Sequence, residues 1–332
     1  MKRVSWALFA VALQSACAVD YAVYVSNERS GDISVIENDA VVATIKAGKR
    51  PRGIHASPDG KHVFVMLSGS PRMAPGVDEN RAPADKAADG LGVIDTTARR
   101  LVEKWHAGSD PEQFAISKDG TLAFVANEDE ASMSIVDLTS GQTRGKVNVS
   151  DEPEGVGVNP MTGEVYVTCE EKGEVFVIEP AEQRVVATLN VGARPRSVAF
   201  QPDGSRAYVA CENDGAVWLI DCAKRATIGR VQLPPKSLPM GTAMSNDGRQ
   251  LYVTTGRGNS LVVLDTVQNS VAAVIPVGDR AWGIALSPDG SKLYTANGAT
   301  NDVSVIDAKA GKELARIKVG DGPWGVTVVS KP

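Results

Sequence analysis

Apolar residues recur along this chain in short runs that alternate with polar residues or are rich in β-branched residues. In a representative stretch, a polar turn at 297–302 separates Leu-Tyr-Thr-Ala at 293–296 from Val-Ser-Val-Ile at 303–306. A helix would need apolar residues at three-four spacing, whereas alternation and β-branched runs are typical of strands. The pattern therefore predicts an all-β chain.

Ser-Pro-Asp-Gly and its variants mark turns at a regular spacing. Asp203, Asp247 and Asp289 stand 44 and 42 residues apart. A period of about 40 to 45 residues, with four strands in each unit, is the signature of a β-propeller blade. The six visible turns lie at 57–60, 117–120, 159–163, 201–204, 245–248 and 287–290. In the last complete unit we predict strands at 283–286, 292–296, 302–306 and 314–319.

The two ends of the chain supply a seventh blade. The stretch 323–329 matches the innermost strand of the repeat, and the stretches 21–27 and 32–36 match the second and third strands. Pairing of the C-terminal strand with the N-terminal ones would close the ring and leave no open strand edge. We therefore predict an all-β fold, a single seven-bladed β-propeller of four-stranded blades over residues 19–332, since a closed propeller reaches this length as one domain.

The first 18 residues have the composition of a secretory signal peptide. Lys2 and Arg3 precede an apolar stretch at 4–13, and Ala16-Cys17-Ala18 offers a cleavage site after Ala18. This predicts a periplasmic protein. Two alternatives are a buried N-terminal element and a lipoprotein anchored at Cys17, but Gln14 stands where a lipobox has an aliphatic residue.

The charge and cysteine content of the chain argue against several kinds of function and site. The formal net charge of -5 disfavours nonspecific nucleic-acid binding, which needs a basic patch. No apolar run reaches the roughly 18 residues that span a bilayer, so we expect no transmembrane segment in the mature chain. Cys169 and Cys211 occupy equivalent positions in neighbouring blades, and Cys222 lies at the far end of its hairpin. We therefore expect no structural disulfide, and no paired Cys or His spacing indicates zinc.

The loops that enter the innermost strands carry Pro-x-Gly or a near variant. We expect them to share one face with the loops between second and third strands, where function usually concentrates. The seven central residues are Arg52, Glu112, Glu154, Arg196, Met240, Trp282 and Trp324, and the flanking cations are Arg50, Arg194 and Arg280. Together they predict a ligand-binding ring at the mouth of the central channel.

The composition of this ring suggests a ligand. Met240, Trp282, Trp324 and Arg52 form one contiguous arc with cations at its border. Tryptophan faces and guanidinium planes suit a flat, electron-rich or anionic molecule. The alternative is that the tryptophans plug the channel while the Arg and Glu residues form exposed structural salt bridges, which contribute little stability.

A long insertion at 68–90 lies on the same predicted face. It lengthens one connection between second and third strands by about 18 residues, as expected of a lid or binding loop. Its prolines, Pro71, Pro75 and Pro83, would stiffen it. Its acids are Asp78, Glu79, Asp85 and Asp89. They are interpreted as solvated, with a cation site such as Ca²⁺ as the alternative.

His55 stands on an inner strand where the other blades have small residues or threonine. It is either a ligand-binding or catalytic histidine or a hydrogen-bonded packing histidine. An acid also recurs after each third strand, and we expect it to cap a turn through its own backbone. These acids are Asp95, Asp137, Asp221, Asp265 and Asp307.

The repeat motif resembles that of the YVTN β-propeller family, seen here at 166–169 and 252–255. More narrowly, Tyr-Val-Ser-Asn at 24–27 and the insertion resemble a periplasmic subgroup associated with PQQ-dependent alcohol catabolism. That resemblance implies a role beside a PQQ-dependent alcohol dehydrogenase and ABC-transport components. PQQ, a planar tricarboxylate, would suit the Trp and Arg arc.

Three functions remain open at this point. A noncatalytic binding or accessory protein is favoured, because the sequence has no Gly-x-Ser-x-Gly elbow and no metal triad. A lactonase-like hydrolase would depend on Glu112, Glu154, His55 and the arginines for its acid-base chemistry. A scaffold would use the aromatic and arginine patch as an interface. A quinoprotein dehydrogenase and a haem protein are disfavoured, since a tryptophan-docking motif and an axial His are missing.

Overall fold

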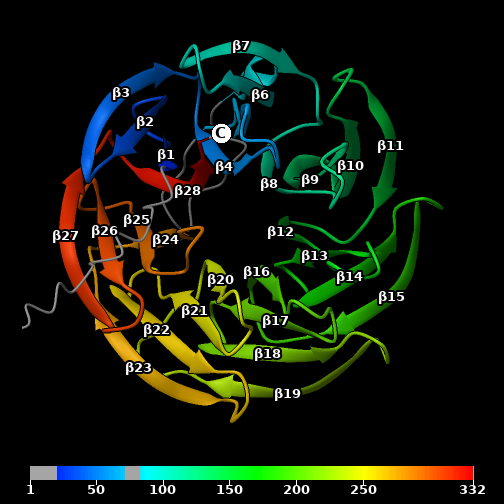
Figure 1. Ribbon diagram of the computed structural model, residues 1–332. Coiled ribbons are helices and arrows are strands. Elements are labelled where there is room, and N and C mark those ends of the chain that lie inside the picture. Colours follow the sequence, from blue (N-terminus) through cyan, green and yellow to red (C-terminus); the bar gives the residue numbers. More distant parts are fainter. Residues whose placement is uncertain (1–20, 72–82, 332) are drawn as a thin grey trace, which may run out of the picture.

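A computed structural model describes residues 21–71 and 83–331, and these form a ring of seven four-stranded antiparallel sheets (Figure 1). In each blade the innermost strand comes first in the following list. The first four blades are β28 (Pro323–Ser330), β1 (Tyr21–Asn27), β2 (Asp32–Glu37), β3 (Ala40–Lys46); β4 (Pro51–Ala56), β5 (His62–Leu67), β6 (Gly90–Asp95), β7 (Arg100–Trp105); β8 (Pro111–Ile116), β9 (Leu122–Asn127), β10 (Ser132–Asp137), β11 (Thr143–Asn148); and β12 (Pro153–Val158), β13 (Val165–Cys169), β14 (Glu174–Glu179), β15 (Arg184–Asn190). The last three are β16 (Pro195–Phe200), β17 (Arg206–Cys211), β18 (Ala216–Asp221), β19 (Ala226–Gln232); β20 (Thr242–Met244), β21 (Gln250–Thr254), β22 (Ser260–Asp265), β23 (Ser270–Pro276); and β24 (Ala281–Leu286), β25 (Lys292–Asn297), β26 (Asp302–Asp307), β27 (Lys312–Lys318).

The ring closes as the sequence predicts. The C-terminal β28 pairs antiparallel with β1, with Val328 opposite Val23 and Val326 opposite Val25. In Figure 1 the red β28 therefore lies in the same blade as the blue N-terminal strands. Because both ends of the chain belong to one sheet, the first and last repeats are fixed to each other.

Apolar side chains pack between neighbouring blades. Blade 1 illustrates this, because its two faces belong to different clusters: Tyr24 and Val35 pack with Val65 of the next blade, whereas Val23 packs with Tyr294 of the preceding one. At the junction with the preceding blade, the hydroxyls of Tyr21 and Tyr294 also form a hydrogen bond of 2.7 Å. Alternation along each strand thus buries one set of residues against each neighbour.

The predicted strands and turns are confirmed, with ends that differ by one or two residues. In the turn at 57–60, the hydroxyl of Ser57 and the backbone N–H of Lys61 both donate to the Asp59 carboxylate, and Gly60 has a positive φ of 70°. The acids after the third strands also accept backbone N–H bonds from residues two or three positions on. They are turn caps, as predicted.

Several other expectations can be placed on the structure. Cys169, Cys211 and Cys222 are buried free thiols. The described residues include no helix long and apolar enough to cross a membrane. The segment assigned to a signal peptide, with Cys17, and residues 72–82 of the insertion, which include Pro75, Asp78 and Glu79, lie outside the described residues.

The two ends of the insertion make polar contacts with each other and with neighbouring loops. Asp89 is buried and accepts the backbone N–H of Gly69 at 2.6 Å. Asp85 pairs with Lys49 at 2.8 Å, next to a short 3-10 helix at Lys86–Ala88. The interpretation as a solvated side chain is wrong for Asp89, which is buried at the base of the insertion, whereas Asp85 is exposed to solvent as expected. A second 3-10 helix, Glu128–Glu130, lies on the same face, and Lys86 pairs with its Asp129.

Removal of residues 323–332 should abolish the cooperative unfolding transition, because it deletes β28, exposes one edge of β1 and takes the buried Val326 and Val329 out of the core. Circular dichroism during thermal denaturation would measure this. A control that lacks only residues 331–332 should unfold like the full chain. A truncated protein that kept a sharp transition at the same temperature would contradict closure through this strand pair.

Candidate functional site

The entrances to the seven innermost strands meet at one end of the ring. Six of the predicted ring residues stand at the second position of their strands and Met240 stands two residues before β20, so the shared blade orientation brings all seven to the same mouth. Five of them line one pocket of about 280 Å³ that is open to solvent. These are Glu154, Arg196, Met240, Trp282 and Trp324; the lining also includes Gln113, Ser197, Gly241 and Gly283.

A buried guanidinium forms one wall of this pocket. Arg196 Nη1 lies 3.2 Å from Glu154 Oε2, and its Nε donates to Glu212 Oε2 at 2.8 Å. The same Nη1 also pairs with Glu170. The side chains of Arg196 and the three acids are each 9% exposed or less. A charge this deeply buried needs such partners, because desolvation of an unpaired ion costs several kcal/mol.

Arg194 binds the same acids from the rim. Its Nε donates to Glu170 Oε2 at 2.5 Å and lies 3.6 Å from Glu212 Oε2. We call Arg194, Arg196, Glu154, Glu170 and Glu212 the Arg196 cluster. Within this cluster two guanidinium cations face three carboxyl groups, and the exposed Arg257 lies 3.6 Å from Glu212 Oε1 as a further cation.

One of these carboxyl groups holds a proton at neutral pH. Burial, together with the negative charge of Glu154, raises the pKa of Glu170 to about 8, against the lowering effect of Arg196 and Arg194. Burial alone would lower the pKa of Arg196, but the three acids around it raise that pKa above its ordinary value. With Glu170 protonated, the two cations of the cluster balance the two remaining carboxylates.

A second ionic cluster lies across the mouth. Arg52 pairs with Asp110 and Glu112, and Ser68 at the base of the insertion donates to Asp110. Burial would raise the pKa of Asp110, but Arg52 and Ser68 lower it below its ordinary value. Carboxylate oxygens of Asp110, Glu112 and Glu128 lie within 4.8 Å of one another. Since the Arg52 guanidinium already pairs with two of these acids, the group is a buried ion-pair network.

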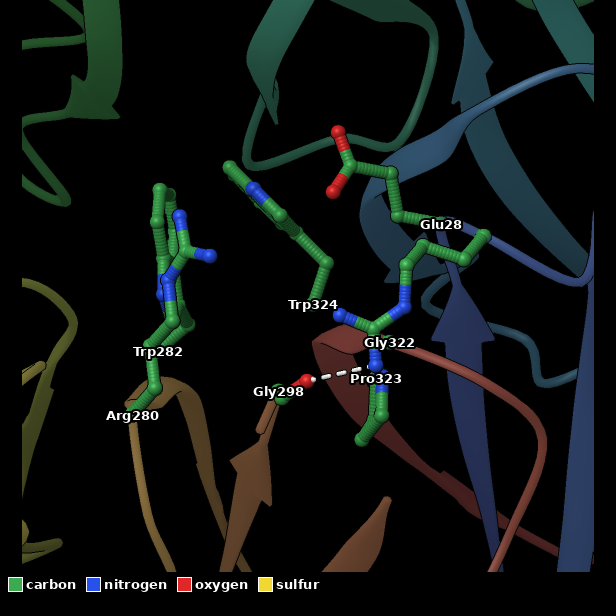
Figure 2. A pocket seen from close by; sticks show the side chains of 8 residues that line it. Glu28, Arg280, Trp282, Gly298, Gly322, Pro323 and Trp324 are labelled. Carbon is green, nitrogen blue, oxygen red and sulfur yellow. Dashed lines mark hydrogen bonds between the residues drawn. The ribbon is translucent and has the colours of Figure 1, made fainter. Parts of the chain in front are cut away.

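The aromatic arc is continuous. The rings of Trp282 and Trp324 lie 5.4 Å apart at 42°, and the guanidinium of Arg280 lies 5.0 Å from the Trp282 ring centre. Arg196 lies 5.5 Å from that ring centre as well. Figure 2 shows Arg280 alongside Trp282, and Trp324 between this stack and Glu28. A neighbouring pocket of about 220 Å³ is lined by Glu28, Arg280, Trp282 and Trp324, together with Arg29, Gly298, Gly322 and Pro323.

Two expectations about charge are wrong. At the border of the aromatic arc, Arg50 pairs with Glu28 at 3.1 Å and Arg194 pairs with Glu170, whereas Arg280 lies against the Trp282 ring as expected. The pairs of Arg52 with Glu112 and of Arg196 with Glu154 exist as the salt-bridge alternative supposed, but they are buried rather than exposed. The salt-bridge alternative is therefore right for these two pairs. The small stabilisation expected of exposed ion pairs does not apply to them, because they are buried.

The sequence analysis did not identify a further set of acids at the mouth, one after the second strand of each of four blades. Glu28, Glu128, Glu170 and Glu212 each directly follow the second strand of a blade. This recurrence was visible in the repeat. Gln113 was missed as well: it follows Glu112 on β8 and lines the pocket, and its Oε1 is buried without a hydrogen-bond partner.

His55 lies apart from this pocket. It sits further along β4, with its ring in an edge-to-face contact 4.8 Å from Phe114. The surrounding strands partly desolvate the ring and lower its pKa below the ordinary value, although the side chain is exposed to solvent. His55 is therefore neutral at neutral pH, and it does not line the pocket with Glu154 and Arg196.

Comparison with known proteins agrees with this architecture. Residues 163–318 match the family model described as lactonase, 7-bladed β-propeller. No curated protein sequence gives a significant match to the chain.

Among solved structures, hydrazine synthase of Kuenenia stuttgartiensis is similar with a TM-score of 0.71 and 20% identity, over 83% of this chain and 89% of that chain. A functionally unknown protein from Desulfotomaculum acetoxidans has a TM-score of 0.78 and 16% identity, over 94% and 100%. A putative 6-phosphogluconolactonase from Bacteroides uniformis has a TM-score of 0.74 and 17% identity, over 94% and 100%. At these identities the likeness shows the fold alone: the chain is a seven-bladed β-propeller.

The proton on Glu170 makes a testable contribution to stability. Its pKa is raised from 4.5 to about 8, so the folded protein binds more protons between these values and loses stability as the pH rises through them. Glu170→Gln fixes the neutral form. The variant should gain stability relative to the natural protein by up to about 1.4 kcal/mol per pH unit across this window. Urea denaturation at a series of pH values measures the difference, and a difference independent of pH would contradict the assignment.

Proposed function

We propose that this propeller hydrolyses lactones in the pocket beside Arg196. The observation that supports it most directly is the juxtaposition of a carboxylate and a guanidinium, Glu154 and Arg196, in one pocket wall. The match of residues 163–318 to the lactonase family model supports the same reading. Lactone hydrolysis needs a general base for water and a positive group for the developing oxyanion, and this pair offers both.

Each residue of the pair has a defined role in this proposal. Glu154 removes a proton from water as the water oxygen bonds to the lactone carbonyl carbon. Arg196 stabilises the negative oxygen of the tetrahedral intermediate, and its charge acts more strongly because the side chain is only 9% exposed. When the ring C–O bond breaks, Glu154 returns its proton to the leaving oxygen. The product is a hydroxy acid.

The rest of the Arg196 cluster keeps this pair in place. Glu212 holds the Nε of Arg196 at 2.8 Å, which fixes the plane of the guanidinium. Glu170 in its protonated form adds a partner without adding charge, because its pKa is about 8. Arg196 thus keeps its positive charge and its orientation while one edge of the site stays open to a ligand.

The aromatic arc favours a second candidate, a noncatalytic binding protein for a flat anion. The Trp282 and Trp324 rings lie 5.4 Å apart, and Arg280 stacks on Trp282. This candidate keeps the sequence-based proposal of a periplasmic protein that handles PQQ beside a PQQ-dependent alcohol dehydrogenase and ABC-transport components. Quenching of tryptophan fluorescence by PQQ, lost in the Trp282→Ala and Trp324→Ala double variant, would support it. Lactone hydrolysis is preferred because the Glu154 and Arg196 pair lines the pocket and residues 163–318 match the lactonase family model.

Glu154→Gln should lower kcat for lactone hydrolysis by about 10² to 10⁴-fold with little change in KM, because the amide cannot accept the proton from water. A pH-stat assay with a panel of lactones measures this. Glu164→Gln is the matched control: Glu164 is also a buried acid paired with an arginine, Arg225, but it lies in the loop between first and second strands on the opposite face. This control should keep full activity. Activity that survived in Glu154→Gln would contradict the proposed role.

A further inference from the structure

Two residues of the pocket wall are hydrogen-bonded through their backbone carbonyls to hydroxyl groups of the preceding blade. Ser197 Oγ, on β16 of blade 5, donates to the carbonyl of Met240 at the entrance to blade 6. Thr254 Oγ1, at the end of β21 in blade 6, donates to the carbonyl of Trp282 at the entrance to blade 7. Met240 and Trp282 both line the pocket. Each of these bonds therefore ties a pocket residue across a junction between blades.

The two bonds belong to one chain of hydrogen bonds. The N–H of Met240 donates to the carbonyl of Thr254 at 2.8 Å, and the N–H of Gly241 donates to Thr254 Oγ1 at 2.9 Å. The chain thus starts at Ser197, passes through the entrance to blade 6 and ends at Trp282. A side-chain hydroxyl supplies the link at each blade junction.

The entrance to blade 6 depends on these bonds because its innermost strand is short. β20 has three residues, whereas the other innermost strands have six or eight. The ladder between β20 and β21 begins at Thr242, so Met240 lies outside it. Hydrogen bonds to Ser197 and Thr254 hold Met240 where the regular ladder does not reach.

Comparison of blades 5 and 6 shows the same bond made from two different strands. A Cβ at Gly241 would lie 2.5 Å from the Trp282 carbonyl oxygen, so this close approach leaves room for glycine only, and Thr254 on the second strand supplies the hydroxyl. In blade 5, Ser197 replaces the glycine and Ala210 stands where Thr254 stands in blade 6. The two blades share the bond to the next entrance carbonyl rather than the residue that makes it.

We propose that Thr254 is a positioning residue, whose hydroxyl holds Trp282 where its ring can contact a ligand. Ser197 does the same for Met240. The Trp282 ring centre lies 5.5 Å from the Arg196 guanidinium, so a shift of the Trp282 backbone would change the spacing between the aromatic and ionic parts of the wall. The effect on substrate binding rests on the proposed function, but the place of the Trp282 ring can be measured without a substrate.

Circular dichroism tests the role of Thr254 directly. The rings of Trp282 and Trp324 lie 5.4 Å apart at 42°, and two indoles this close couple their electronic transitions into an exciton couplet. Loss of the couplet in Trp282→Phe identifies it. Thr254→Val, which removes the hydroxyl but keeps the shape of the side chain, should weaken the couplet, and Thr254→Ser should restore it. An unchanged couplet in folded Thr254→Val would overturn the proposal.

Thr266→Val is the matched control. The buried Thr266 also donates to a backbone carbonyl of its own blade, that of Gly248 at 2.6 Å, but in the turn on the opposite face. Thr266→Val should lower the free energy of unfolding as Thr254→Val does, because both lose a buried hydrogen bond. Its couplet should stay unchanged. An equal weakening in both variants would indicate general loosening of the blade and would overturn the proposal.

Kinetics with glucono-δ-lactone measure the effect on substrate binding. Thr254→Val should raise KM about 2- to 10-fold, the loss of one aromatic contact, while kcat stays unchanged because Glu154 and Arg196 are intact. Thr254→Ser should restore KM. A lower kcat at unchanged KM would contradict a role in the binding wall. If neither this lactone nor dihydrocoumarin is hydrolysed by the natural protein, the proposed function fails, whereas the couplet still decides the role of Thr254.

Ser197→Ala provides a second test in case Thr254→Val does not fold. Five of the seven blades have glycine at this position, so a blade can form without the Ser197 side chain. The variant frees the Met240 carbonyl and, through the Met240 N–H bond to Thr254, loosens the next link of the chain. KM should rise and the couplet should weaken. No change in either quantity in this folded variant would overturn the proposal.

Discussion

Pairing of β28 with β1 is the constraint on which the rest of the structure depends. A single blade cannot bury its own two faces, so repeat units become stable by packing against neighbours on both sides. Closure gives the first blade a neighbour on each face, since Tyr24 and Val23 pack in different directions. It also fixes seven strand entrances around one mouth. The pocket exists because residues from distant repeats, such as Glu154 and Trp324, are brought to the same point.

Within that mouth, burial of charge governs the chemistry. An arginine that is 9% exposed must be paired, and Arg196 pairs with acids from two blades, its own and the preceding one. Burial and the negative charge of Glu154 raise the pKa of Glu170, so Glu170 keeps its proton at neutral pH. The ion pairs of Arg196 with Glu154 and Glu212 fix its guanidinium in the pocket wall.

The sequence predicted the fold almost completely and the site in part. Turns at a fixed period depend on local residues, Asp and Gly above all, so Asp59 and Gly60 could be placed without any tertiary contact. The seven entrance residues followed from the same repeat. The sequence offered pairing of the ring's Arg and Glu residues only as an alternative, and it could not give the burial of Arg196, because that depends on how far one blade lies from the next. Asp89 was misjudged for a similar reason: only the folded insertion shows it buried against Gly69.

The most direct test of the account is a crystal structure of the Glu154→Gln variant soaked with glucono-δ-lactone. The account predicts an intact lactone in the pocket, with its carbonyl oxygen within hydrogen-bond distance of the Arg196 guanidinium and its ring against Trp282 and Trp324. A lactone bound elsewhere on the propeller, or one in this pocket with its carbonyl oxygen turned away from Arg196, would contradict it.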